Sequence, residues 1–386
     1  MSAALHLAQH GTRSLVLEAA GIGHGAAGRS SGLVNAGMWV APDDVVAALG
    51  TDYGERLLQV LGEAPRFVCD LIEKQGIACE LERSGTLQCA VGRAGLRTIR
   101  VRAEQLIRRG AAVDTLDAAA TARMVGSSFY DGALLDRRTA TVQPLAYVRG
   151  LASAATSAGA QIYTDSPVLA VERAGTGWRV CTIHGTVRTE WIIVATDAYT
   201  SGPWTEVRRE IIQLPYFNIA TEPLVDRVLA SVLPEKQGVT DTRTVLSSIR
   251  LDQTGRLIIG SIGALRGAGT RIHTAWAQRA VTKLFPQVGD CGIEYAWYGS
   301  IGMTRTHLPM FHRLAPQVLS VSGYNGRGIA AGTIFGHLLA QLILGGISES
   351  DVPLPLSEPT EATFRSLRSL YYEAGARAWH FIDART

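Results

Sequence analysis

The chain has 386 residues, of which 47% are hydrophobic, and it carries 37 Lys and Arg against 34 Asp and Glu for a net charge of +3. This balance excludes an intrinsically disordered chain, and the length allows two or three domains with buried cores. The basic residues are scattered rather than clustered, which argues against a nucleic-acid-binding protein.

The cysteines have the spacing of neither a metal site nor a CxxC redox pair. Their odd number argues against a disulfide framework, so free thiols in a reducing cytoplasm are expected. The start of the chain lacks the basic and apolar regions of a secretory signal. The five positions are Cys69, Cys79, Cys89, Cys181 and Cys291.

The first eighteen residues have the pattern of the second half of a βαβ dinucleotide-binding unit. Residues 2–10 favour a helix, Gly11 is a natural helix stop, and residues 14–18 (SLVLE) predict a short strand that ends in Glu18. In such a unit the acidic residue follows a GxGxxG loop by about 20 residues. Counting back from Glu18 places that loop before Met1, so we expect these residues to lack the unit's first strand and glycine loop.

Helical and strand patterns then alternate along the chain. The patterns predict helices over 55–75, 93–125 and 145–158 and a last helix that begins near Gly326. Strands are expected over 84–91, 161–164, 168–172, 178–183 and 191–195, and the span 209–299 reads mostly as strands, with a turn at Asp252–Gly255.

This order predicts an α/β fold with two interleaved domains. The first is a Rossmann-like, N-terminally truncated cofactor domain made of residues 1–75, 140–208 and 300–386. The second is a sheet-rich α+β substrate domain made of residues 76–139 and 209–299. Residues 328–346 are apolar and approach the roughly 20 residues of a membrane span. They include His337, Gln341 and several glycines, so we expect a buried helix and no membrane span.

Four stretches, in the correct order, resemble the D-amino-acid-oxidase superfamily of FAD-dependent oxidoreductases, which includes glycine and sarcosine oxidases. They are residues 2–32, IIVATDAYT at 192–200, QLPYFNIATEPL at 213–224 and residues 297–345, which contain GYNGRG. The motifs ATDAYT, IATEPL and GYNGRG are most similar to the γ-glutamylputrescine oxidase branch. The resemblance spans nearly the whole chain and implies an FAD enzyme without a metal.

Two segments are expected to hold the phosphate and ribose groups of FAD. Glu18 ends a strand, where a carboxylate can accept both ribose hydroxyls, although a solvated glutamate is the ordinary alternative. The loop with Gly28, Arg29, Ser30 and Ser31 offers close backbone approach, a cation and hydroxyls to an anion. The resemblance places this loop against the pyrophosphate and flavin.

The remaining cofactor contacts rest mainly on the resemblance. Gly326, Arg327, Gly328 and Ile329 open an apolar helix, whose free N–H groups and dipole stabilise negative charge near flavin N1 and O2. A plain glycine turn is the alternative. The backbone of Val168, otherwise a core valine, would bind the adenine edge. Ala195 and Gly302 would also lie at the cofactor. No cysteine stands where some relatives attach FAD, so non-covalent FAD is expected.

FAD supplies the difficult chemistry of such an enzyme, so no dedicated nucleophile is required. Hydride would pass from the carbon beside a neutral amine to flavin N5, and the resulting imine would hydrolyse. Amino-acid-oxidising members carry an arginine in a G-L-R-P pattern that binds the substrate carboxylate in a bidentate pair. Here Thr304 stands at that position, which favours an amine or N-substituted amine such as a γ-glutamylputrescine-like compound. Arg305 restores the contact if the loop is shifted, which leaves a D-amino acid or glycine as the alternative.

The pocket and acid–base candidates are chosen by chemistry and resemblance. Tyr324, Thr304 and Arg305 are the candidate catalytic residues. Aromatic side chains near a flavin can form a cage for an amine. The other candidates are Trp297, Tyr298, Asn35 and Met38 for the pocket, His307 and His312 as acid–base groups that more commonly lie at the surface, and Arg266 as a cation near N5.

Two interpretations from other classes stay open. One is a non-catalytic, truncated remnant or subunit that no longer binds FAD tightly. The other is an NAD-dependent dehydrogenase, since Glu18 suits either dinucleotide. The acceptor can be oxygen or an electron carrier, and the oligomeric state is not predicted. The FAD interpretation requires the Glu18 carboxylate, at the end of the early strand, and the amides that open the helix near Gly326 to face one shared cleft.

Overall fold

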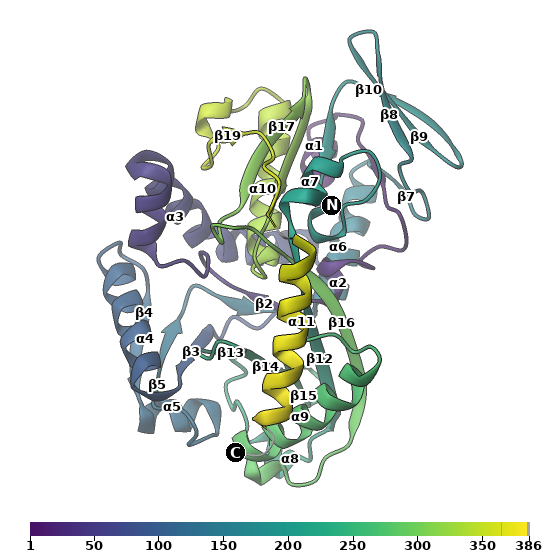
Figure 1. The fold of residues 1–386 in the computed structure, drawn as a ribbon. Helices are drawn as coiled ribbons and strands as arrows, with labels where there is room; N and C mark the ends of the chain where they lie inside the picture. Colours follow the sequence, from purple (N-terminus) through teal and green to yellow (C-terminus); the bar gives the residue numbers. More distant parts are fainter. Residues whose placement is uncertain (364, 384–386) are drawn as a thin grey trace.

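The computed structural model describes residues 1–363 and 365–383, and it has two parts that meet along the long strand β16 (Figure 1). The lower part in Figure 1 is built on an eight-stranded sheet of order β16-β12-β15-β14-β13-β3-β5-β4. Only the β13–β3 pair is parallel. The strands are β3 (Thr86–Ala90), β4 (Val113–Asp117), β5 (Gly132–Asp136), β12 (Ile212–Pro223), β13 (Gly238–Asp241), β14 (Ser247–Leu251), β15 (Arg256–Ile262) and β16 (Ile293–Met303).

One face of the large sheet holds the largest apolar core, and the other face is more polar. Along β12, Phe217 and Ile219 point into the core with Trp276 of α9 (Ala268–Leu284). Because successive side chains alternate across a strand, Tyr216 and Asn218 point to the opposite face. The helices α4 (Gly92–Ile107), α5 (Ala118–Val125) and α8 (Asp226–Leu229) complete this part.

The upper part contains the long helices and several short sheets. Its helices are α1 (Ser2–Gln9), α2 (Ala26–Arg29), α3 (Pro42–Gln75), α6 (Pro144–Ser157), α7 (Thr205–Glu210) and α10 (Gly328–Ile343). α1 packs on α6 and α10, and apolar side chains of these helices and of α3 form two cores. The short sheets are β1 (Leu15–Leu17) with β7 (Gln161–Tyr163), β2 (Leu33–Val34) with β6 (Ala140–Thr141), the hairpin β8 (Ala170–Ala174), β9 (Gly177–Thr182), β10 (Gly185–Thr189), and β11 (Ile192–Val194), β18 (Val318–Ser322), β17 (Met310–Ala315), β19 (Leu356–Ser357).

The parallel strands of the upper part form separate pairs. β1 pairs with β7 in one sheet, and β11 pairs with β18 in another. A Rossmann-like unit joins such strands in one sheet through a central strand. The described residues contain no strand that joins the two pairs.

The helix α11 (Arg365–Ile382) crosses the front of the molecule and packs on β12 and α9 (Figure 1, yellow). The predicted division assigned residues 365–382 to the cofactor domain. Their packing partners β12 and α9, however, belong to the part that contains the large sheet. We therefore propose the division 1–75, 140–208 and 300–363 for one domain, and we assign α11 to the other.

Most of the predicted elements are confirmed within a few residues at either end. Several were missed: β4 lies inside the span predicted as helix, α9 lies inside the span predicted as strands, and α11 follows the helix predicted to be last. No strand was predicted at β5, β10, β17 or β18. The helix predicted over 55–75 begins earlier, at Pro42, with a kink at Gly50. The α/β fold class is confirmed. Among the described residues, no helix combines the length and the apolar character needed to cross a bilayer.

Candidate functional site

Three segments that are far apart in the sequence meet at Asn325. The backbone N–H of Asn325 donates to the Gly302 carbonyl (3.1 Å), and its side-chain Oδ1 accepts from the Thr304 N–H (2.9 Å). The indole Nε1 of Trp39 donates to the Asn325 carbonyl (2.9 Å). Asn325 has a positive φ of 51°, which an Asn-Gly turn tolerates. The end of β16, the turn before α10 and the loop around Trp39 are therefore held together.

Asp197 adds a fourth segment to this junction. It lies just after β11, and its Oδ1 accepts the Gly323 N–H at 2.6 Å. A Cβ atom at Gly302 would lie 2.8 Å from the Asp197 carboxylate oxygens, so glycine is needed for the close approach. Desolvation raises the pKa of Asp197, and the bond from the Gly323 N–H opposes that rise.

Arg327 places a buried cation at the start of α10. It is 9% exposed, its Nη1 donates to the Ala36 carbonyl (2.9 Å), and its guanidinium lies over the Trp39 ring at 4.2 Å. Burial, with a contribution from nearby Arg102, lowers the pKa of Arg327 to about 9. Its Nε is buried without a hydrogen-bond partner, and no ion pair of Arg327 occurs among the described residues. A bound anion would offset this buried charge.

Arg102 fixes the same loop from the other side. Its guanidinium donates to the carbonyls of Met38 (3.1 Å) and Trp39. Desolvation lowers the pKa of Arg102 as well. The loop that follows β2 is thus held between a helix of the large-sheet part and the start of α10.

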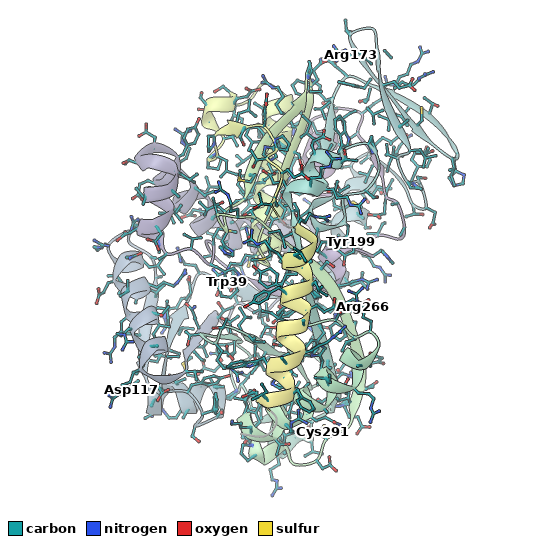
Figure 2. All side chains as sticks on the ribbon, in the orientation of Figure 1. Trp39, Asp117, Arg173, Tyr199, Arg266 and Cys291 are labelled. Atoms are coloured by element: carbon teal, nitrogen blue, oxygen red, sulfur yellow. The ribbon has the colours of Figure 1, made fainter. Side chains whose placement is uncertain are left out.

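The loop around Arg29 is attached to the polar face of the large sheet. The backbone carbonyl of Arg29 accepts hydrogen bonds from Asn218 Nδ2 (3.2 Å) and Trp297 Nε1 (3.0 Å). Its guanidinium donates to the carbonyls of Tyr298 (2.9 Å) and His24 (2.6 Å). Arg29 therefore positions the loop, whereas the sequence alone led us to expect a cation directed at a phosphate. Tyr199 supports the same region by accepting the Ser300 N–H at 3.0 Å, and Figure 2 shows Trp39 and Tyr199 where the two parts of the molecule meet.

Gly28 and Ser30 give this loop the features of a ligand cradle. A Cβ atom at Gly28 would lie 2.2 Å from the Gly23 carbonyl oxygen, so the backbone at residue 28 packs directly against the backbone at residue 23. Ser30 Oγ and Ser322 Oγ are buried without a hydrogen-bond partner. Buried hydroxyls normally have partners, so these two atoms are available to bind a polar ligand. Ser31 contributes its carbonyl, which accepts from Nε of the buried Arg250 (2.7 Å).

The other predicted cofactor residues lie at the ends of short strands. Glu18 follows β1, and its carboxylate accepts the Ala20 N–H (3.1 Å). Val168 lies before β8, outside the β8–β9 pairs, and Ala195 follows β11. The loop after Glu18 leads to Trp39, whose indole donates to the Asn325 carbonyl beside the start of α10. Gly326, Gly328 and Ile329 lie in that start, and Gly326 has a positive φ of 85°.

The three predicted catalytic residues differ in their surroundings. Thr304 is buried, and its Oγ1 donates to the Leu308 carbonyl (2.7 Å). Tyr324 donates its hydroxyl to the Val321 carbonyl (3.1 Å) and packs on the core below α10; burial raises its pKa well above the ordinary value. Arg305 is exposed. The hydroxyl groups of Thr304 and Tyr324 therefore both donate to backbone carbonyls, so neither has a free proton to donate to a substrate.

His312 does not lie at the surface as expected. It is fully buried on β17, and its Nε2 lies 2.6 Å from Glu210 Oε2. His307 is exposed, with a positive φ of 57°. Arg266 is bound to Glu373 of α11. Its side chain is 64% exposed. The partners of His312 and Arg266 give both of them a structural role.

The pocket candidates lie on the elements that meet at the site. Trp297 and Tyr298 belong to β16 and bond to the Arg29 loop. Met38 is buried, and Asn35 accepts from Thr86 Oγ1 (3.2 Å). Sequence reasoning missed Asp197, Asn218, Asn325, Trp39 and Arg250. The Tyr-Asn-Gly turn was the signal for Asn325, whereas nothing local marked Asn218 or Arg250.

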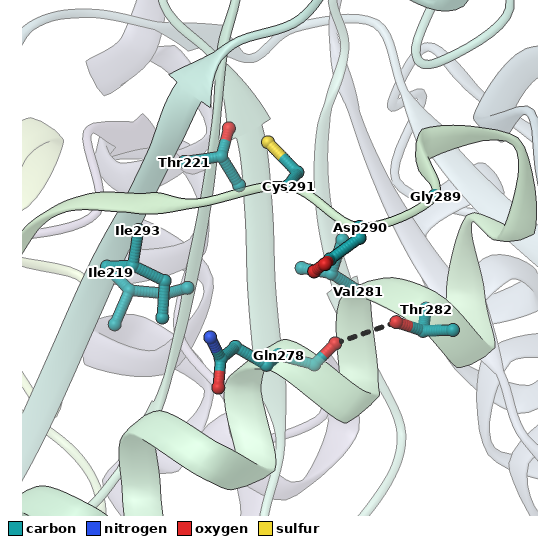
Figure 3. A pocket seen from close by; sticks show the side chains of 9 residues that line it. All are labelled: Ile219, Thr221, Gln278, Val281, Thr282, Gly289, Asp290, Cys291 and Ile293. Carbon is teal, nitrogen blue, oxygen red and sulfur yellow. Dashed lines mark hydrogen bonds between the residues drawn. The ribbon is translucent and has the colours of Figure 1, made fainter.

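A small cavity lies elsewhere, on the core face of the large sheet. It measures about 30 Å³ and is lined by β12, β16 and α9, where Thr282 Oγ1 donates to the Gln278 carbonyl at 3.2 Å (Figure 3). Such a volume holds about one water molecule. It is too small for an organic substrate.

Comparisons with known proteins identify the family of the chain. Residues 1–342 match the family model described as FAD dependent oxidoreductase (DAO). The chain is 31% identical over 386 residues to gamma-glutamylputrescine oxidoreductase of Escherichia coli, covering 96% of this chain and 89% of that protein. It is 29% identical over 390 residues to the probable oxidoreductase OrdL of Haemophilus influenzae, covering 99% and 89%.

Solved structures share the fold at low sequence identity. Glycine oxidase from Geobacillus kaustophilus has a TM-score of 0.74 at 19% identity, covering 90% of this chain and 92% of that chain. Iminodiacetate oxidase from Chelativorans has a TM-score of 0.72 at 18% identity, covering 93% and 96%. The family match covers most of the chain, and the cofactor of that family is FAD. This protein belongs to the DAO family of FAD-dependent oxidoreductases.

Proposed function

We propose that this chain oxidises the C–N bond of an amine, with non-covalent FAD held between the loop of residues 23–39 and the start of α10. The observation that carries the proposal is the junction at Asn325, where the loop, the end of β16 and the start of α10 are hydrogen-bonded together. The unpartnered Ser30 Oγ, Ser322 Oγ and Arg327 Nε support the proposal, because a polar, anionic group could satisfy them.

The residues of the chain have distinct roles in this proposal. FAD, when bound, supplies the acceptor for the hydride and both electrons. Gly28 and Ser30 hold the pyrophosphate, and Glu18 holds the ribose. The amides of Gly326 and Gly328 and the buried cation of Arg327 stabilise negative charge at the opposite end. Asp197 and Asn325 hold these amides in position. Val168, Ala195, Gly302 and Ile329 complete the contacts.

The substrate we propose is an amine or N-substituted amine such as a γ-glutamylputrescine-like compound. The buried hydroxyl of Thr304, which already donates to the Leu308 carbonyl, cannot bind a carboxylate as an arginine would. The relative from Escherichia coli is a gamma-glutamylputrescine oxidoreductase, which supports this class. The neutral amine would react, and water would hydrolyse the resulting imine to an aldehyde or a ketone.

One experiment separates this proposal from its alternatives. The purified protein, supplied with FAD, is mixed without oxygen with γ-glutamylputrescine, sarcosine, glycine or D-alanine, and the flavin absorbance is followed. We expect FAD binding and bleaching by γ-glutamylputrescine. Bleaching by D-alanine or glycine alone would support the amino-acid alternative and overturn the amine proposal. Absence of FAD binding would support the non-catalytic remnant.

The acceptor can be identified in the same preparation. Peroxide formed after air is admitted identifies oxygen as the acceptor, whereas reduction of an added dye without peroxide identifies an electron carrier. FAD binding without bleaching by any amine would contradict amine oxidation while it leaves the cofactor assignment intact.

A further inference from the structure

The outer face of α11 carries a continuous stripe of large apolar side chains. Their exposed fractions are 62% for Leu367, 63% for Leu370, 74% for Tyr371, 49% for Phe381 and 60% for Ile382. At 3.6 residues per turn these positions fall on one side of the helix. The small residues Ala374, Gly375 and Ala378 fill the same side, so the stripe contains no charged side chain.

The opposite face of α11 is already occupied by its own protein. Glu373, Ala376 and His380 are buried there, where α11 packs on β12 and α9. A helix with apolar side chains on all of its faces is normally buried all round. The inner face of α11 is buried, whereas its apolar outer face is exposed. In Figure 1 the outer side of α11 faces the viewer, and no other helix or strand of the described residues crosses it.

The exposed apolar area is that of an interface. At about 200 Å² for each fully exposed large side chain, the five fractions amount to roughly 600 Å², the upper limit of apolar patches on monomeric proteins. The partly exposed Trp379, together with Ala374 and Ala378, brings the face close to the about 800 Å² that each partner contributes to a standard interface.

The order of large and small side chains makes the stripe complementary to itself. The bulky residues stand at the two ends, and Ala374, Gly375 and Ala378 stand in the middle. In an antiparallel pair, Leu367 of one helix meets Ile382 of the other and Tyr371 meets Ala378, while Ala374 lies beside Gly375 at the axis. A Cβ atom added at Gly375 would meet nothing within 4 Å in its own chain, so a second helix can approach closely there.

We propose that this face binds the same face of a second copy of the chain, so that two α11 helices pack antiparallel across a two-fold axis. Such an interface is closed, because the same residues contribute from both sides, and it therefore stops at a dimer. It uses no residue of the site around Asn325, so the dimer does not depend on the proposed function.

Sedimentation velocity tests the proposal on the full chain. We expect a species of twice the 41.3 kDa chain mass. The double variant Leu370→Asp/Tyr371→Asp should raise the dimer dissociation constant about thirtyfold or more, since it places charges in the apolar interface. Val225→Asp, at a residue that is 67% exposed between β12 and α8, is the matched control and should leave the dimer intact.

A cysteine at the axis gives a second, independent measurement. In a background with Cys181→Ser and Cys291→Ser, the Gly375→Cys variant should form a disulfide-linked dimer on oxidation, whereas Thr270→Cys, exposed at the start of α9, should not. A monomeric wild-type chain, or a dimer that persists in the double variant while the Gly375→Cys variant fails to cross-link, would overturn the proposal. Co-sedimentation of a monomeric chain with anionic phospholipid vesicles would assign the face to a membrane surface and overturn it as well.

Discussion

Gly28 and Gly21 lie in the same loop, yet the space around them differs completely. A Cβ atom at Gly28 would lie 2.2 Å from the Gly23 carbonyl oxygen and 2.9 Å from a methyl carbon of Leu145, whereas one at Gly21 would meet nothing within 4 Å. Neither position requires a positive φ, so the difference is purely one of packing. The loop proposed to hold the pyrophosphate therefore depends on the absence of one methyl group.

We predict that Gly28→Ala weakens FAD binding at least tenfold and lowers the free energy of unfolding by about 1–3 kcal/mol, the usual cost of overpacking. The added methyl group forces residues 23–28 apart. Titration of flavin fluorescence and urea unfolding would measure the two effects. Gly21→Ala should match the wild-type protein in both, and equal behaviour of the two variants would show that the close contact has no role.

At the scale of elements, α11 is attached through a buried histidine pair. His273 Nδ1 of α9 lies 2.8 Å from His380 Nδ1 of α11, and the His380 ring stacks on Trp276 at 4.1 Å. Burial, reinforced by Arg377 despite the opposing Glu373, lowers the pKa of His273 to about 4. Burial, together with His273, Arg243 and Arg279, lowers the pKa of His380 to about 3. The folded protein thus keeps both rings neutral.

We predict that the free energy of unfolding falls as the pH decreases from about 6.5 towards 4, because only the unfolded chain binds protons on these rings in that window. The contribution is fully present above pH 6.5. The double variant His273→Gln/His380→Gln should lose less thermal stability than the wild type between pH 7.5 and pH 5. His184→Gln, at an exposed histidine, should keep the wild-type loss. An unchanged loss in the double variant would exclude the pair as its source.

At the scale of the whole molecule, β16 and β12 connect the two parts. Trp297 and Asn218 both donate to the Arg29 carbonyl, so the large sheet holds the loop proposed to bind FAD. The end of β16 continues to Gly302, where it meets Asn325 and Asp197. The site thus depends on how the two parts are joined, and not on either part alone.

We predict that Trp297→Phe raises the FAD dissociation constant about threefold to tenfold, since it removes one hydrogen bond worth about 1 kcal/mol and frees the Arg29 loop. Trp178→Phe is the matched control: it removes a bond of the same kind, from Trp178 Nε1 to the Pro316 carbonyl at 3.0 Å, on the β8–β10 hairpin. Isothermal titration with FAD would compare them. An equal effect of the two variants would indicate a general loss of stability instead.

Local patterns in the sequence determined much of the fold. Three elements followed from patterns among near neighbours in the sequence. Apolar alternation predicted the strands over 84–91 and 178–183, and helical spacing predicted the helix over 145–158. They are confirmed as β3, β9 and α6. The four stretches in the correct order were sufficient to predict the family, and with it the cofactor, through their resemblance to the D-amino-acid-oxidase superfamily. The turn at Asp252–Gly255 followed from its residues alone.

Only the tertiary structure decided which partner each polar side chain finds. His312 was expected at the surface, but Glu210, about a hundred positions away in the chain, lies beside it in the core. Arg29 resembled a phosphate ligand, yet two backbone carbonyls hold it. Helix α9 was hidden among strand patterns, and α11 was missed, because the burial that selects a helix face comes from distant segments. Local chemistry thus determined the kind of protein, whereas contacts between distant segments decided the arrangement of its site.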